Sequence, residues 1–134
     1  MIPSQTSYGI SVALDMDYGQ AVDKTVAALK EQGFGVLTEI DVQATLKKKL
    51  DVDFRPYIIL GACNPPLAYR ALSAEQQVGL LLPCNVIVFQ NDDGTSTVSA
   101  LNPMAAMTVA GNPALSEVAE AATAKLKAAL DSLK

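Results

Sequence analysis

The stretch that decides the fold begins with Tyr57-Ile58-Ile59-Leu60-Gly61-Ala62-Cys63-Asn64 and ends with Leu80-Leu81-Leu82-Pro83-Cys84-Asn85-Val86-Ile87-Val88-Phe89. It contains the two most apolar runs of the chain and both cysteines. Short apolar runs bounded by turn residues are typical of buried strands. The stretch therefore predicts two central strands joined through a helix. One Cys-Asn pair follows the first strand, and the other comes directly before the second strand.

The segments on either side predict an α+β fold with five strands. Asp17 and Gly33 are placed to begin and end the first helix, and Asn64 and Asn112, each followed by proline, are placed to cap two later ones. The predicted elements, in order, are strand 6–14, helix 18–32, strand 34–42, helix 43–50, strand 54–62, a helix from Asn64, strand 86–90, a strand from Thr95 to 101, and a helix from Asn112 to the C-terminus.

The relation between the third and fourth strands decides where the two thiols lie. A right-handed parallel crossover through the intervening helix, which the usual handedness rule favours, would place the cysteines at opposite edges of the sheet. An antiparallel pair would bring them together, and residues 76–83 are long enough to carry the chain back first. Both arrangements stay open at this point.

Length and composition indicate one domain over residues 1–134, without a membrane span or a nucleic-acid site. The apolar runs are far shorter than the about 20 residues that a bilayer requires. A net charge of −4 argues against binding to phosphate backbones. The first residues, Met1 to Gln5, lack the pattern of a signal peptide, so we expect a cytoplasmic protein.

Histidine is absent. This excludes catalytic triads that use histidine, zinc sites with histidine ligands and acid–base catalysis by histidine. Glu39 and Asp41 share one parity of the second strand and could form a metal or acid–base pair, although two solvent-facing carboxylates are the stronger interpretation. Met104, Met107 and Val109 form an apolar loop or a single helical turn. They could mark a contact surface, but methionines more often fill gaps in a core.

Three blocks of the sequence resemble a known family. The blocks are Thr38-Glu39-Ile40-Asp41-Val42, the run from Tyr57 to Ala68, and the run from Gly79 to Val86. They are similar to the uncharacterised prokaryotic family called domain of unknown function 302. The resemblance implies a two-layer α+β homodimer in which helices cover one face of a mixed, mostly antiparallel sheet, and it implies no established activity.

The resemblance also supplies a candidate ligand-binding site. Its residues are Glu39, Asp41, Cys63, Asn64, Cys84 and Asn85. We expect a small cytoplasmic homodimeric protein that binds a small molecule near the two cysteines, with no cofactor and no catalytic residue assigned.

The alternative function is a thiol-based redox or metal-handling protein that uses Cys63 and Cys84. Cys63 lies just before a helix N-terminus, whose positive dipole end favours a thiolate. Free cysteine is also among the most buried residue types, so a structural role competes with a reactive one. Zinc needs four ligands, so two thiolates would have to recruit carboxylates or a second subunit, whereas copper(I), a soft ion, accepts thiolates more readily.

Overall fold

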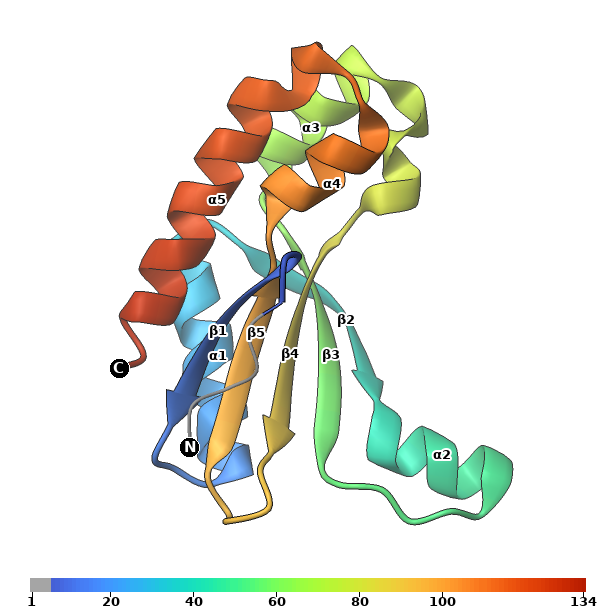
Figure 1. Ribbon diagram of the computed structural model, residues 1–134, viewed down its shortest axis with the longest axis vertical. Coiled ribbons are helices and arrows are strands. Elements are labelled where there is room, and N and C mark those ends of the chain that lie inside the picture. The colour runs from blue at the N-terminus through green and yellow to red at the C-terminus, as the bar shows by residue number, and fades with distance from the viewer. Residues whose placement is uncertain (1–5) are drawn as a thin grey trace.

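The computed structural model describes residues 6–134, so the N-terminal Met1 to Gln5 lies outside the described part. One five-stranded sheet forms its centre, with the strand order β1-β5-β4-β3-β2 and every pairing antiparallel (Figure 1). The strands are β1 (Gly9–Leu14), β2 (Gly35–Asp41), β3 (Tyr57–Cys63), β4 (Cys84–Gln90) and β5 (Ser96–Leu101). The α+β class and the five strands predicted from sequence are confirmed.

The parallel crossover favoured for the third and fourth strands is wrong. After β3 the chain forms α3 (Pro65–Ala74) and the 3-10 helix η1 (Gln76–Leu81), which stay at the end of the sheet where β3 stops (Figure 1). The chain never crosses the sheet, so β4 starts beside the end of β3 and runs back along it. Ala62 is opposite Cys84 in this antiparallel pair, and no pair in the sheet is parallel among the described strands.

Two long helices cover one face of the sheet, as expected. They are α1 (Tyr18–Glu31) and α5 (Ser116–Asp131) (Figure 1). Asp17 caps α1 by accepting a hydrogen bond from the Gln20 amide at 2.8 Å. The main core lies between these helices and the sheet, where Leu29, Leu60 and Leu126 are fully buried. We call this region the packed layer.

A second group of helices sits at the end of the sheet where β3 stops, and we call it the helical cap. It consists of α3, η1, α4 (Pro103–Ala110), η2 (Pro113–Leu115) and the first half of α5 (Figure 1). The sequence predicted only a loop or one turn at Met104 to Val109, but Asn102 caps a helix of two turns there. Met107 packs against the small core of the cap, whereas Val109 is exposed.

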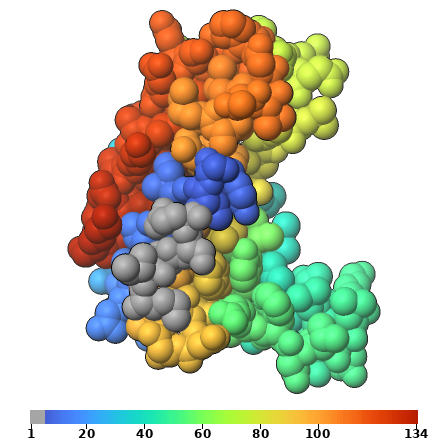
Figure 2. Space-filling model, in the orientation of Figure 1, coloured from blue at the N-terminus to red at the C-terminus, as the bar shows by residue number. Residues whose placement is uncertain are grey.

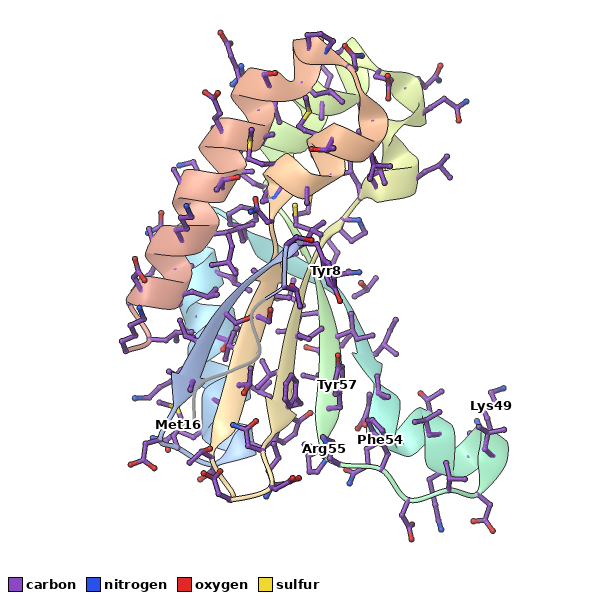
Figure 3. All side chains as sticks on the ribbon, viewed as in Figure 1. Tyr8, Met16, Lys49, Phe54, Arg55 and Tyr57 are labelled. Carbon is purple, nitrogen blue, oxygen red and sulfur yellow. The ribbon has the colours of Figure 1, made fainter. Side chains whose placement is uncertain are left out.

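The helix α2 (Val42–Leu50) and the loop to residue 56 project from the opposite end of the molecule, and we call residues 42–56 the arm (Figures 1 and 2). None of the residues of α2 is buried. Leu50, Val52 and Phe54 are exposed, and the Phe54 ring lies 6.1 Å from that of Tyr57 at the base of the arm (Figure 3). Figure 2 shows a recess between the arm and the helical cap.

The sheet face opposite α1 and α5 carries no helix among residues 6–134 (Figure 1). Because side chains alternate along a strand, Ile59 and Ile87 point away from the packed layer, which holds their neighbours Leu60 and Val86. Tyr57 stacks on Phe89 of the adjacent strand on this open face, with ring centroids 5.3 Å apart. Across the described residues, no helix combines the length and the apolar character needed to cross a membrane.

Candidate functional site

A cavity of about 400 Å³ lies between the helical cap and the end of the sheet. Its floor comes from the ends of β3, β4 and β5, through Ala62, Cys63, Cys84 and Leu101, and from Thr38 in the middle of β2. Its walls come from α3, η1, α4 and α5. The volume lies within the range of about 300–1,000 Å³ that is usual for small-molecule sites.

Small side chains create this space. Each of the three cap helices contributes two alanines three or four positions apart, which places both on the same face of the helix. The pairs are Ala68 and Ala71 in α3, Ala106 and Ala110 in α4, and Ala119 and Ala122 in α5. These small side chains leave room between the three helices, and larger residues of the same helices, Leu67, Met107 and Val118, also line the cavity.

The lining is almost entirely apolar. Its only polar or thiol side chains among the described residues are Thr38, Cys63, Asn64 and Cys84, and none of these lining residues carries a formal charge. Leu37 and Leu72 line the cavity and are also exposed, so they mark its connection to solvent. The arrangement offers a ligand a large apolar contact area and few hydrogen bonds.

Asn64 has a structural role at the edge of this site. It is the N-cap of α3, where its side-chain oxygen accepts from the Leu67 amide at 3.3 Å. Its side-chain nitrogen donates to the Gln32 carbonyl, also at 3.3 Å. Both ends of the amide are used within the protein, so Asn64 joins α3 to the end of α1 and fixes where Cys63 lies.

Gly33 makes room for this amide. Its φ of +82° belongs to the left-handed region that favours glycine. A Cβ atom at this position would lie 3.0 Å from the Asn64 side-chain nitrogen. The sequence signal for the end of a helix at Gly33 is therefore confirmed, and it marks the junction between the packed layer and the helical cap.

Both thiols line the floor of the cavity. Both are free and half-buried, and Cys84 is opposite Ala62, the residue before Cys63. Burial raises the pKa of the Cys84 thiol above its ordinary value, and the nearby Cys63 raises that pKa further. Cys84 is therefore a neutral thiol at pH 7, which is the less nucleophilic form.

The other residues of the sequence-based site lie outside the cavity lining. Glu39 and Asp41 are exposed on β2, and Asp41 caps α2 by accepting from the Ala44 amide at 2.9 Å. Asn85 is exposed on β4 opposite Gly61. Across residues 6–134, no three histidine, cysteine, aspartate or glutamate side chains are grouped so that they could hold a metal ion.

The comparisons with known proteins agree with the three sequence blocks. The sequence model of the family described as "Domain of unknown function DUF302" matches residues 10–133. The chain belongs to the DUF302 family. The crystal structure of an uncharacterized conserved DUF302 protein from Bacillus stearothermophilus is similar to this chain, with 32% sequence identity and a TM-score of 0.88. That similarity covers 96% of this chain and 100% of the Bacillus stearothermophilus chain. No curated protein matches this DUF302 chain.

Proposed function

We propose that this DUF302 protein is a single-domain, cytoplasmic, homodimeric protein that binds a small molecule in the cavity beside Cys63 and Cys84. The observation that carries the proposal is the cavity itself, which is of ligand size and is lined by paired alanines from three helices. Two free thiols agree with a reducing compartment. Glu39, Asp41 and Asn85 are left out of the proposed site because they do not line the cavity.

The binding function is tested by amide chemical shifts, which report a ligand's position whatever its chemistry. A panel of neutral, anionic and cationic small molecules is added to the labelled protein. We expect at least one of them to shift the amide signals of Ala71, Ala106 and Ala122 together. The variant Ala122→Leu, which narrows the cavity, should weaken or lose these shifts. Shifts confined to other regions, or none from any of the three classes, would refute a ligand site in the cap.

The homodimer is supported by the arm. Isolated helices shorter than about 12–15 residues are marginal in water, and the nine-residue α2 has no buried residue to stabilise it. The arm also differs in charge from the rest of the chain. It holds four of the ten cationic residues and two of the fourteen acidic ones, so it is net +2 while the remainder is net −6. A basic arm and an acidic body fit a second copy of the same chain.

The dimer is tested with matched leucine variants and sedimentation measurements. Leu50 in the arm and Leu80 in the cap are both exposed, so a carboxylate at either position should leave the fold intact. We expect Leu50→Asp to be a monomer at a protein concentration where Leu80→Asp and the unmodified protein are dimers. A monomeric unmodified protein, or a Leu50→Asp dimer, would contradict an interface at the arm.

A thiol-based redox or metal-handling role is the second candidate, because both cysteines line one cavity. The raised pKa of Cys84 argues against it, since thiolates perform both kinds of chemistry. Thiol titration before and after mild oxidation tests the redox role, and elemental analysis of protein purified without a chelator tests the metal role. Loss of two thiols on oxidation, or one equivalent of a soft metal, would favour this candidate over simple binding.

A further inference from the structure

We propose that the ligand of the cavity is an uncharged and mainly apolar small molecule, with at most one weakly polar group. This inference rests on the proposed binding function and names the class of ligand. It follows from three properties of the cavity. The described lining carries no charge, the amide side chain of Asn64 already makes two hydrogen bonds within the protein, and most of the wall is aliphatic.

A charged ligand would find no oppositely charged side chain among the described residues that line the cavity. Burying an ionised group without a counter-charge is strongly unfavourable. Charged side chains of the cap that could have paired with a ligand bind other residues of the protein instead. Arg70 of α3 pairs with Glu117 of α5 at 3.4 Å, and both side chains are largely exposed. Glu75 accepts a hydrogen bond from the Asn112 side chain at 3.0 Å.

The lysine-rich arm does not supply the missing charge. Lys47, Lys48 and Lys49 belong to α2, which projects at the end of the molecule opposite the cap (Figure 1; Figure 3 labels Lys49). Lys47 is also paired with Asp51 and Asp53, at 3.1 and 3.3 Å. A carboxylate or phosphate inside the cavity would therefore be without a cation among the lining residues.

The polar groups that remain suit a ligand with little hydrogen bonding. The Asn64 amide is used by Leu67 and Gln32, as described above. The thiols of Cys63 and Cys84 are weak donors and weak acceptors, so they tolerate an apolar neighbour better than a hydroxyl or an amide would. Thr38 is the one hydroxyl in the described lining. A single hydroxyl, carbonyl or ether oxygen on the ligand matches this set.

The experiment compares three ligands that share one chain and differ in charge. The neutral dye N-phenyl-1-naphthylamine, which fluoresces in apolar surroundings, is bound first. It is then displaced at pH 7.5 with 1-decanol, decanoate or decylammonium, each below its aggregation concentration. We expect decanol to compete at a concentration at least tenfold lower than either ion. Equal competition by the three, or tighter binding of an ion, would overturn the neutral-ligand inference.

Variants connect the dye to the cavity. Ala122→Leu and Ala106→Leu narrow it from two different helices, and circular dichroism shows which of them is folded. We expect each folded variant to lose at least tenfold in dye affinity, while Ile87→Thr on the open sheet face keeps it. Dye binding that survives unchanged in a narrowed cavity, or that Ile87→Thr abolishes, would place the dye elsewhere and overturn the inference.

Failure of this inference differs from failure of the proposed function. If the dye does not bind, or if the ions compete as well as decanol, the neutral ligand class is wrong. The cavity still binds small molecules if the amide signals of Ala71, Ala106 and Ala122 respond to a charged member of the panel. If those amides respond to no member of any class, the binding function itself is wrong.

Discussion

The packed layer and the helical cap are both apolar, yet the first is filled and the second keeps a cavity beside its small core. The helix α5 takes part in both, so it allows a comparison within one element. Toward its C-terminus, Leu126 and Leu130 are fully buried against the sheet and α1. Toward its N-terminus, Ala119 and Ala122 line a cavity of about 400 Å³. The difference teaches that side-chain size across an interface, rather than apolar composition, decides whether a core has room for a ligand.

A pair of leucine-to-alanine variants gives the clearest test of this difference in packing between the layer and the cap. Leu126→Ala removes a fully buried side chain from the packed layer, so we expect the free energy of unfolding to fall by about 2–5 kcal/mol. Leu72→Ala, at the exposed edge of the cavity lining, should lower it less, by about 1 kcal/mol, because Leu72 is only partly buried. Urea denaturation measures both. Equal losses would mean that the cap is packed as tightly as the layer.

Two alanine-to-leucine variants of α5 sharpen the same comparison. Ala129 is buried in the packed layer, so Ala129→Leu should destabilise the protein by about 1–3 kcal/mol through overpacking. Ala122 faces the cavity, so Ala122→Leu should leave the free energy of unfolding unchanged or raise it, since the added methylenes enter empty space. Urea denaturation of the two variants provides the measurement. A cost for Ala122→Leu that matches Ala129→Leu would show that the cavity closes in solution.

Gly33 probes the junction between the packed layer and the helical cap, and Gly94, in the turn between β4 and β5, is its control. Gly33 and Gly94 have similar φ values, +82° and +86°, so replacement of either by alanine should cost about 1–2 kcal/mol from the left-handed backbone. A Cβ at Gly33 would also press on Asn64, whereas nothing lies within 4 Å at Gly94. We therefore expect Gly33→Ala to lower the melting temperature more than Gly94→Ala. Identical shifts would show that Asn64 moves aside freely.

The smallest expected effect concerns the pH dependence of stability. The folded protein raises the pKa of Cys84 above its ordinary value of 9.0, chiefly through burial. The folded protein therefore favours the neutral Cys84 thiol. This contribution to stability is fully present below the pKa of the unfolded thiol and is lost as the pH rises through the pKa of the folded one. Between pH 8 and 10, the melting temperature of the unmodified protein should fall more steeply than that of Cys84→Ala. Parallel curves would mean that Cys84 is fully solvated.

The sequence predicted the local elements well because their signals are local. Asp17 and Asn64 accept hydrogen bonds from backbone amides of the helices that they were expected to cap. Asn112 was expected to open the long C-terminal helix, but it caps the 3-10 helix η2, and α5 begins at Ser116 without a side-chain cap. Gly33 ends α1, as its position after the apolar stripe indicated. Each of these signals depends on residues a few positions apart, so it is readable without knowledge of the fold.

The cavity and the strand direction were not predictable in the same way. The path from β3 to β4 depends on α3 and η1 staying on one end of the sheet, which the handedness rule for simple crossovers does not anticipate. Alanine pairs such as Ala106 and Ala110 are visible in the sequence, but their spacing is the same in a filled core. The space depends on how the helices that carry them are placed around it in the fold.

The strand β2 stands at one margin of the sheet, and its backbone there is open to pairing with a foreign strand. A bulge between Val36 and Thr38 interrupts the regular ladder, and the exposed carboxylates of Glu39 and Asp41 follow it. Irregular geometry and like charges both discourage the growth of an intermolecular sheet. We therefore expect these two acids to disfavour aggregation at an edge that no other strand of residues 6–134 covers.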